Sequence, residues 1–357
     1  MRILDRYLLR ELAGFFATTF IVLLLFALSQ KWVGLLSKAV SGELSLDVVS
    51  MTVLLSSPEL FTILIPFSLF LSVLFLIGRL CADNERVVMH ALGITPFHLL
   101  KVIVIPALVL SLFLAGLTLY GLPRIQEYKE KYILEQGQNM LWQNRVAGRF
   151  HVTPDGKTVF YAETHNADEA LEEGVFIFEA PKGMPTKGNP WEVITAKVGY
   201  WSYQNEQSPY LILETGWRYE GIPGHADYVR LRFARFGRKI AISPIEVPEL
   251  RRTRRTSTLW HSYEKGDIAE LEYRTSLPLT VLLLALLAVP LGVIQPRQGK
   301  FARLLPGMIV FLLYMNALSV CRRYVENETL SAYVGLWWVH AVVLAGVVLT
   351  WRRQFLR

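Results

Sequence analysis

The sequence predicts a polytopic α-helical membrane protein with six transmembrane helices and an all-β domain inserted between the third and the fourth. Three observations predict this fold class: six long apolar runs, one long polar section that divides them three and three, and basic residues gathered near the ends of the runs. Each run is close to the roughly 20 apolar residues that a helix needs to cross a bilayer core about 30 Å thick. In lipid every backbone N–H and C=O must find a partner within the segment, so we expect all six runs to be helices. The runs are 12–36, 53–77, 102–122, 277–294, 304–320 and 334–351.

Composition agrees with a membrane protein that carries one polar domain. The 357 residues are 52% hydrophobic and 19% charged, which is too apolar on average for a soluble protein of this size. The net charge of +7 could indicate nucleic-acid binding. However, the lysines and arginines cluster at the ends of the apolar runs, where membrane proteins place them for orientation, so no nucleic-acid partner is expected.

Orientation follows from the charges of the short loops. With the N-terminus in the cytoplasm, twelve basic residues lie on the cytoplasmic side and three on the other side, and this bias is the one that membrane proteins show. Six crossings then return the C-terminus to the cytoplasm, and the long polar section lies outside it. The twelve are Arg2, Arg6, Arg10, Arg79, Arg86, Lys101, Arg297, Lys300, Arg303, Arg352, Arg353 and Arg357, and the three are Lys38, Arg322 and Arg323.

The first apolar run could instead belong to a cleaved signal peptide. Arg2, Arg6 and Arg10 form a positive n-region, and Ala27-Leu28-Ser29 resembles a cleavage site. We favour a retained helix because the run is longer than a usual signal core and resumes after Lys31. Cys81 and Cys321 fall on opposite sides of the membrane in this topology, so no disulfide is expected between them.

The chain therefore divides into residues 1–123 with helices 1 to 3, 124–272 with the outer domain, and 273–357 with helices 4 to 6. Short segments rich in β-branched and aromatic residues recur in the outer domain between turn residues, a spacing typical of a sandwich or jelly roll. A polar helix is expected before them at 123–144. The predicted strands are 149–153, 158–163, 175–179, 192–203, 210–214, 217–221 and 228–236, with turns at 154–157, 181–183 and 223–224.

One predicted strand carries alternating arginines. In Val229-Arg230-Leu231-Arg232-Phe233 the apolar residues share one face and the arginines the other. This pattern fits a half-buried strand with a solvated face. It also fits a surface on which Arg230 and Arg232 bind an anionic ligand such as a lipid phosphate. The basic cluster 251–255, where the chain returns to the membrane, could hold lipid headgroups in the same way.

The loop between the second and third helices, at about 79–93, predicts a short amphipathic helix on the cytoplasmic surface. Four polar residues, Arg79, Asp83, Arg86 and His90, recur at spacings that line one face. Glu85 projects away from that stripe among apolar side chains, where an unpaired carboxylate is costly unless a partner supplies a cation. We therefore interpret the helix as a docking element for another subunit. The alternative is an interfacial helix that lies on lipid while Glu85 reaches water.

Local signals also set the ends of this loop. Gly93 is placed to cap the short helix, and Thr95-Pro96 can start the next one. Lys31 and Glu59 lie near the outer ends of the first two helices, where both can reach the interface. The alternative for Lys31 is that it faces a cavity and attracts a negatively charged lipid.

No catalytic motif is found. Gly156-Lys157-Thr158 resembles the end of a phosphate-binding loop, but His151 stands where the first glycine is needed. His90 and His340 have no neighbouring residues at metal-ligand spacing. The sequence therefore predicts neither an enzyme nor a bound cofactor or metal, and any energy source must lie in another protein.

Four segments together resemble the permease subunits of the bacterial lipopolysaccharide export machine, the LptF and LptG family, and the resemblance covers the whole chain. The methionine-containing part of the loop segment and the Pro296–Lys300 segment are more similar to the LptF branch. The segments are Arg6-Tyr7-Leu8-Leu9-Arg10-Glu11, Glu85-Arg86-Val87-Val88-Met89-His90-Ala91-Leu92-Gly93, Val289-Pro290-Leu291-Gly292-Val293 and Pro296-Arg297-Gln298-Gly299-Lys300.

The resemblance implies a subunit of an ABC transporter in the inner membrane, with both termini cytoplasmic and the jelly roll periplasmic. The implied partners are an LptG-like paralogous permease, an LptB-like ATPase dimer, an LptC-like periplasmic bridge protein, lipopolysaccharide and membrane lipid. Glu85 matches the family's ATPase-contacting glutamate, with Asp83, Arg86 and His90 beside it. Lys31 matches a basic residue near the lipid phosphates, whereas a second basic position of the family is Gly34 here.

Two other classes of function remain open at the level of sequence. A membrane-anchored scaffold or sensor without transport activity would also carry an outer β domain. An intramembrane enzyme would need paired polar residues deep in the helices, and the sequence offers only Glu59, Asn316 and His340.

Overall fold

A computed structural model describes most of the chain in two compact units. The helical unit contains 1–36, 49–130 and 248–357, and the sheet unit contains 37–48 and 131–247. The predicted turns at 154–157 and 182–183, Pro223, and all of Pro296–Lys300 except Gly299 lie outside the described residues. The described residues are 3–40, 46–143, 148, 150–152, 158–166, 171–181, 190–202, 210–222, 224–239, 250–294, 299, 301–331 and 334–355.

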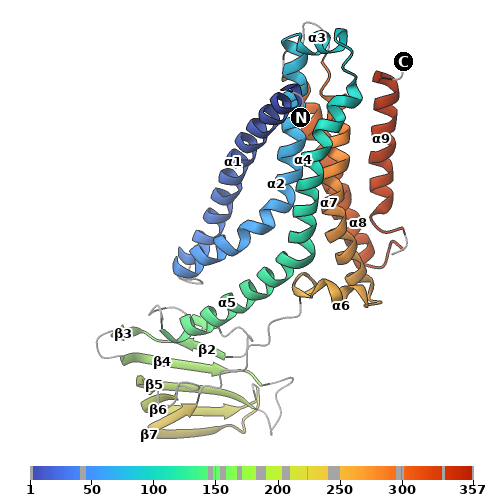
Figure 1. Cartoon of the computed structure of the whole chain (residues 1–357). Helices are drawn as coiled ribbons and strands as arrows, with labels where there is room; N and C mark the ends of the chain where they lie inside the picture. The colour runs from blue at the N-terminus through green and yellow to red at the C-terminus, as the bar shows by residue number, and fades with distance from the viewer. Residues whose placement is uncertain are drawn as a thin grey trace. The chain divides into compact units, whose positions relative to one another are not determined.

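Long helices run along the helical unit, and short ones lie at its two ends (Figure 1). The short helix α3 and both chain termini lie at the same end, and α6 lies at the other. The chain passes from this unit to the sheet unit within α5 and returns before η2. The helices are α1 Ile3–Val40, α2 Leu46–Ala82, α3 Glu85–Ala91, α4 Pro96–Gly116, the π-helix η1 Leu117–Gly121, α5 Leu122–Gln143, the 3-10 helix η2 Arg251–Thr253, α6 Thr256–Trp260, α7 Lys265–Leu291, α8 Leu304–Glu326 and α9 Trp337–Phe355.

Five of the described helical segments are long and apolar enough to cross a membrane. They correspond to the first five predicted runs. The sixth run is the 19-residue helix α9, whose last turn carries Arg352 and Arg353 and lowers its apolar content. The sixth crossing therefore stays a prediction. The five segments are Ile3–Ser37, Leu46–Ala82, Pro96–Leu134, Lys265–Leu291 and Leu304–Glu326.

Burial differs sharply among these helices. In α2 and α7, 72% of the most apolar stretch is buried inside the chain, whereas in α1 only 6% is. Large apolar side chains of α1 such as Val22, Leu25 and Phe26 are more than half exposed. A helix of this kind packs little against its own chain, so its surface is available to lipid or to another membrane protein.

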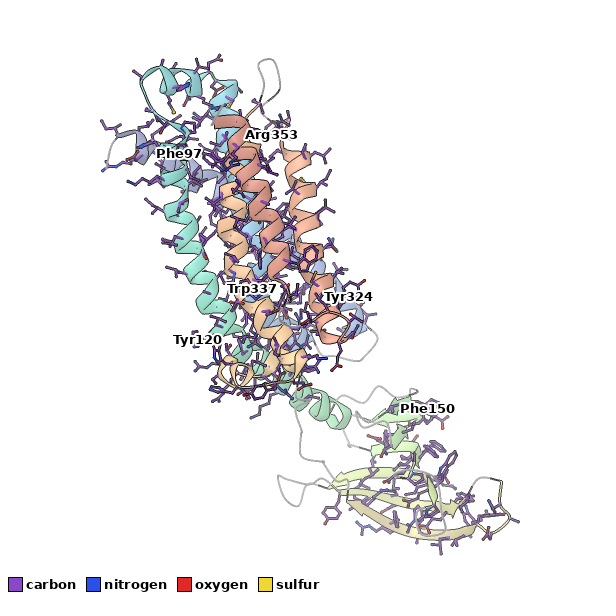
Figure 2. All side chains as sticks on the ribbon, turned by 90° about the vertical axis from the view of Figure 1, so that its right-hand side faces the viewer. Phe97, Tyr120, Phe150, Tyr324, Trp337 and Arg353 are labelled. Carbon is purple, nitrogen blue, oxygen red and sulfur yellow. The ribbon has the colours of Figure 1, made fainter. Side chains whose placement is uncertain are left out.

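Exposed aromatic side chains mark a level near the α6 end of the helical unit. Tyr120, Tyr324 and Trp337 lie at similar heights in Figure 2, while Phe97 and Arg353 lie toward the other end. All three of the first group are about half exposed or more. Tyrosine and tryptophan concentrate at the headgroup level of a bilayer, which agrees with a membrane boundary here.

The sheet unit contains one seven-stranded antiparallel sheet with the order β1-β2-β4-β5-β6-β7, and β3 pairs with β4 (Figure 1). Two predicted strands, 210–214 and 217–221, are one continuous strand β6, and the short strand β3 was not predicted. The strands are β1 Phe150–Val152, β2 Thr158–Tyr161, β3 Thr164–Asn166, β4 Leu171–Glu179, β5 Trp191–Ser202, β6 Tyr210–Gly221 and β7 Val229–Lys239.

A crease crosses the sheet along one line of opposed residues. Pairing on either side of this line keeps the same register, but the residues on the line, Glu163, Gly174, Lys197, Thr215 and Ala234, are missing from the ladder. Gly174 and Thr215 have φ values of 62° and 54°. Residues with positive φ break the regular alternation of a strand; here the line separates β2 from β3 and crosses four other strands, β4 to β7.

The crease exchanges which residues face the core. In β6 the buried positions are Leu211 and Leu213 before the crease and Gly216 after it, so the alternation shifts by one residue. The same shift keeps the apolar side chains of both halves on one face. They form one core cluster: Phe160, Ala162, Val175, Ile177, Ile194, Ala196, Leu211 and Leu213.

The two halves of the sheet fold toward each other across the crease. Arg238 pairs in register with Leu211, which is opposite Trp201 on β5. Trp201 is nine residues from Glu192, about 30 Å along a flat strand. Nevertheless, Arg238 Nη1 lies 2.9 Å from Glu192 Oε2. The sheet is therefore layered on itself, which agrees with the predicted sandwich-like packing, whereas the described strands follow a meander and jelly-roll connections stay a prediction.

Candidate functional site

The short helix α3 is separated from α2 by two residues, Asp83 and Asn84. Asn84 has φ 60°, a left-handed conformation that asparagine tolerates better than most residues, and it directly precedes α3. At the other end Gly93 has φ 80°, and its N–H donates to the carbonyl of His90 at 2.9 Å. Thr95 and Pro96 then start α4. The predicted ends of this loop at Gly93 and Thr95-Pro96 are confirmed.

The predicted polar stripe does not lie on one helix. Arg79 is in the last turn of α2 and Asp83 follows its end, while Arg86 and His90 belong to α3. The prediction was wrong because it assumed a continuous helix, and the backbone turn at Asn84 breaks the helical spacing. Asp83 instead accepts from Arg79 Nε at 3.3 Å, and His90 is exposed.

Glu85 is paired within its own chain, which corrects the expectation that a partner must supply its cation. Tyr7 of α1 donates its hydroxyl to Glu85 Oε2 at 3.2 Å, and Arg79 Nη2 lies 3.2 Å from Glu85 Oε1. Arg79 also donates to the Tyr7 hydroxyl at 2.6 Å and forms an ion pair with Glu11. These four residues, the Glu85 cluster, connect α1, α2 and α3.

Besides His90, large apolar side chains are exposed on α3 and at its C-terminal end. Val87, Val88 and Leu92 are 66%, 58% and 74% exposed, whereas Met89 is buried against the helical core. Arg86 approaches Cys81 Sγ at 3.9 Å. A short helix that is anchored on one side and presents apolar side chains on the other has the features of a docking surface.

A cavity of about 620 Å³ lies beside the Glu85 cluster. Its walls are mainly apolar, and Arg79 and Glu11 belong both to the cavity and to the cluster. The cavity lies along α1 between Arg10 and Thr19. It is lined by Arg10, Glu11, Gly14, Phe15, Thr18, Thr19, Phe75, Arg79 and Phe301.

Lys31 lies toward the far end of α1 and faces Glu59 of α2. Lys31 Nζ is 3.7 Å from Glu59 Oε2, and Lys129 Nζ of α5 is 3.8 Å from the same oxygen. The two lysines therefore share one carboxylate. The sequence did not indicate Lys129, because its partner is 70 positions away in the chain and only the fold brings them together.

Arg230 and Arg232 lie on the edge strand β7. The Arg230 guanidinium is 3.7 Å from the centre of the Trp217 ring and that of Arg232 is 5.6 Å from it. Val229 and Leu231 were expected to be buried, but they are 52% and 49% exposed, because β7 has a neighbour on one side only among the described strands. The arginines thus cover an aromatic side chain of β6, and an anion-binding role for them stays a prediction.

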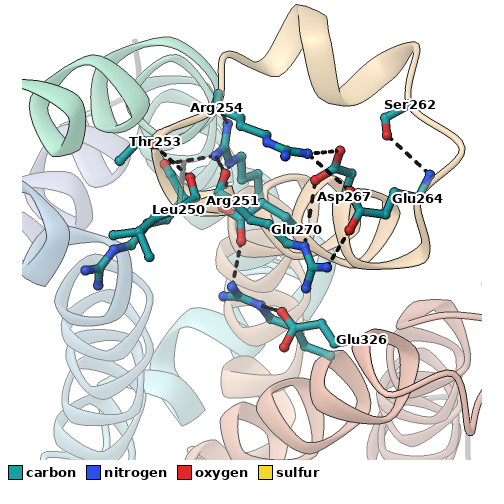
Figure 3. Close-up of polar contacts among 12 residues, drawn as sticks. Leu250, Arg251, Thr253, Arg254, Ser262, Glu264, Asp267, Glu270 and Glu326 are labelled. Carbon is teal, nitrogen blue, oxygen red and sulfur yellow. Dashed lines mark hydrogen bonds and ion pairs between the residues drawn. The ribbon is translucent and has the colours of Figure 1, made fainter. Parts of the chain in front are cut away.

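The basic cluster at 251–255 is largely committed to carboxylates of the same unit, which argues against the interpretation that it holds lipid headgroups (Figure 3). Arg251 Nη2 lies 2.6 Å from Glu264 Oε1, and Arg254 Nη1 lies 2.7 Å from Asp267 Oδ2. Arg252 pairs with Glu130 at 2.7 Å. Hydrogen bonds from Arg251 and then Arg254 lower the pKa of Glu264, and the Glu264 carboxylate raises the pKa of Arg251.

Beneath this cluster is a buried ion pair that the sequence did not indicate. Arg274 of α7 donates to Glu270 at 2.8 Å and to the Thr256 hydroxyl at 3.1 Å. It also donates to three backbone carbonyls of the segment 251–254, at 3.1 to 3.3 Å. Arg322 of α8 reaches the second oxygen of Glu270 at 2.7 Å. This Arg274 cluster fastens the returning chain to α7 and α8.

The polar residues inside the described helices do not form an open catalytic site. His340 bonds to Tyr314 at 2.6 Å and to Ser276 at 2.8 Å, but all three side chains are at least 95% buried. A substrate could not reach them without displacing packed helices. Asn316 donates to the carbonyl of Leu312, one turn earlier in its own helix. Among the described residues no group of His, Cys, Asp or Glu could hold a metal ion, and both cysteines are free.

Long apolar helices, a short apolar-faced helix at one end and an inserted antiparallel sheet define a multi-pass membrane protein with an inserted β unit. Residues 6–353 match the family described as lipopolysaccharide export system permease LptF/LptG, and the chain belongs to that family. The family assignment made from the four segments is therefore confirmed. It is a family of permeases and not of enzymes, and its members belong to the inner membrane export system.

The curated relatives agree along nearly the whole length. The lipopolysaccharide export system permease protein LptF of Escherichia coli strain K12 is 29% identical over 350 residues, which cover 96% of this chain and 93% of the relative. LptF of E. coli O157:H7 and of Shigella flexneri shows the same identity and coverage.

Proposed function

We propose that this chain is the permease subunit of an ABC transporter that extracts lipopolysaccharide from the inner membrane and passes it to a periplasmic bridge toward the outer membrane. In this proposal six helices cross the membrane, both termini and α3 are cytoplasmic, and the sheet unit is a periplasmic jelly-roll-like domain. The partners are an LptG-like permease, an LptB-like ATPase dimer and an LptC-like bridge protein. The family and the arrangement of α3 relative to the termini support this orientation.

The observation that carries the proposal is that α3 is exposed on its apolar side and bonded to α1 on its other side. Val87, Val88 and Leu92 offer an apolar surface to a cytoplasmic ATPase. Glu85 connects the same helix to Tyr7 and, through Arg79, to Glu11. A displacement of α3 is therefore transmitted directly to the first transmembrane helix.

Coupling then follows from two conformations of the helical unit. Nucleotide-driven closure of the ATPase moves α3 as a rigid element, and the Glu85 cluster moves the cytoplasmic end of α1 with it. Because α1 packs little against its own chain, it can shift at small energetic cost relative to the tightly buried α2 and α7. Such a shift narrows the lipid-binding space between this chain and its paralogue.

Affinity purification of the full chain in mild detergent tests the assembly. The expected result is that a cytoplasmic ATPase and a second multi-pass protein copurify. Glu85→Ala is expected to abolish lipid export and the coupling of ATP hydrolysis to it, while the helical unit stays folded. Glu328→Ala is the matched control, because it removes an exposed glutamate that lies outside α3, just after the end of α8. Unchanged export and coupling in Glu85→Ala, or the absence of any ATPase, would contradict the proposal.

A further inference from the structure

Glu59 occupies an unusual electrostatic position in the helical unit. Its Oε2 atom lies 3.7 Å from Lys31 Nζ and 3.8 Å from Lys129 Nζ, so one carboxylate serves two ammonium groups from α1 and α5. Glu130, the neighbouring acidic residue on α5, is already paired with Arg252 at 2.7 Å. The three groups, the Glu59 clasp, therefore carry a net charge of +1.

Both contacts of the clasp are loose. Charge-assisted N–H···O hydrogen bonds are about 2.7–2.9 Å long, and neither lysine approaches Glu59 this closely. The Lys129 side chain is only 9% exposed, and a buried ammonium group requires compensation by negative charge. The Glu59 carboxylate supplies only one negative charge, and it lies 3.7 and 3.8 Å from the two ammonium groups. A phosphate monoester carries about −1.5 to −2 at neutral pH and three acceptor oxygens, so it matches a pair of lysines better.

We infer that Glu59 is the internal counterion of a phosphate site formed by Lys31 and Lys129, and that a lipid phosphate displaces it when lipid enters. The inference rests on the proposed function, because it names the regulation of the site where this permease receives its lipid. Without lipid, Glu59 closes α1 against α2. With lipid bound, the phosphate takes both lysines and the contact between α1 and α2 opens at this end.

The mechanical consequence depends on the way α1 is held. Only 6% of its most apolar stretch is buried in the chain. Arg79 of α2 pairs with Glu11 near the beginning of α1, and Glu59 of α2 pairs with Lys31 near the end. Exchange at Glu59 therefore frees one end of the helix while the Glu85 cluster still holds the other. Lipid binding therefore acts on α1 near Lys31, and α3 acts on the same helix at its other end.

Lipid binding by the purified full chain, with the membrane partners that copurify in mild detergent, tests the exchange. The probes are a phosphorylated lipid A and the same lipid after removal of its phosphates. Glu59→Gln removes the competing charge and keeps the shape of the side chain. Since a partly exposed ion pair is worth about 0.2–1 kcal/mol, the variant is expected to bind the phosphorylated probe about 1.4- to fivefold more tightly. Its affinity for the dephosphorylated probe stays unchanged.

Two further variants keep the result interpretable. Glu59→Asp retains the charge but shortens the side chain, so its affinity is expected between those of the wild type and Glu59→Gln. Glu130→Gln changes the neighbouring carboxylate that pairs with Arg252, and wild-type affinity is expected. Equal affinity of wild type and Glu59→Gln for the phosphorylated probe overturns the inference, and so does an equal gain for both probes.

Spin labels report the opening itself. Val33→Cys on α1 and Ile63→Cys on α2 are exposed positions near the clasp, and Cys81 and Cys321 are replaced by alanine in this background. The phosphorylated probe is expected to widen the label distance in the wild type, and Glu59→Gln is expected to show the wide distance without lipid. If the label distance in lipid-free Glu59→Gln is as short as in the lipid-free wild type, the inference that Glu59 holds α1 against α2 is overturned. Failure of the wild-type complex to export lipid at all would refute the proposed function instead.

Discussion

Removal of the Arg274 side chain tests whether the buried ion pair holds the returning chain to the helical unit. In Arg274→Met, Glu270 loses one of its two arginine partners, and three backbone carbonyls of the segment 251–254 lose their donor. Both members of the pair have side chains no more than 6% exposed. Removing one partner of a buried pair costs about 3–5 kcal/mol, and the value should lie in this range because water cannot replace Arg274 here.

The assay is unfolding in mixed micelles with increasing SDS, followed by loss of helical circular dichroism, with hydrogen exchange at 251–260 to locate the loosened segment. Arg323→Met is the matched control, since Arg323 is the exposed neighbour of Arg322 on α8, and a change within about 0.5 kcal/mol is expected. Glu270→Gln completes a double-mutant cycle, with a coupling energy of about 1–3 kcal/mol. A loss in Arg274→Met no larger than in Arg323→Met would refute the reasoning.

Three further predictions concern charges and backbone strain. The arginine partners of Glu264 lower its pKa. Its contribution to stability is therefore complete above the ordinary pKa of about 4.3 and is lost as the pH falls through the lowered pKa. Hydrogen exchange of η2 should rise in acid for this reason, and Glu264→Gln should remove that pH dependence. Thr215→Gly should stabilise the sheet unit by about 1 kcal/mol in urea unfolding, because a β-branched residue is strained at φ 54°, whereas Thr195→Gly in a regular strand should destabilise it. Arg230→Ala should cost about 0.5–1 kcal/mol and change the fluorescence of Trp217, which the guanidinium covers.

Each of these outcomes has a clear contrary result. Acid exchange in η2 that is the same in Glu264→Gln as in the wild type would show that another group controls its docking. A destabilised Thr215→Gly would mean that the crease depends on the threonine side chain. Unchanged fluorescence in Arg230→Ala would mean that the guanidinium does not rest on the indole in solution.

The features that local chemistry determines could be predicted from the sequence. Continuous apolar runs predicted α1, α2, α4, α7 and α8, because a chain in lipid must satisfy its backbone within each segment. Gly93 and Pro96 predicted two boundaries, since one favours positive φ and the other fixes φ at a helix start. The helix break at Asn84 was missed, because asparagine is also compatible with a continuing helix and only the surrounding packing selects the left-handed conformation.

Contacts between distant segments could not be predicted. Glu85 was recognised as a carboxylate that needs a cation, and Arg79 supplies it only because α3 turns back beside the end of α2. The pairing of Lys129 with Glu59 depends likewise on the approach of α5 to α2. In β7 the alternating pattern was real, but alternation alone does not indicate that the strand lies at an edge.

On each side of the crease, the strands that cross it have their own alternation of buried and exposed side chains. Deleting Lys197 from β5 would turn the side chains beyond it to the wrong layer and leave those before it in place. An insertion or deletion in any one strand should therefore be tolerated only where it keeps Glu163, Gly174, Thr215 and Ala234 aligned across the sheet. The β unit therefore depends on one row of residues whose alignment across the strands must be kept, and the two layers on either side of this row can vary in sequence as long as it is kept.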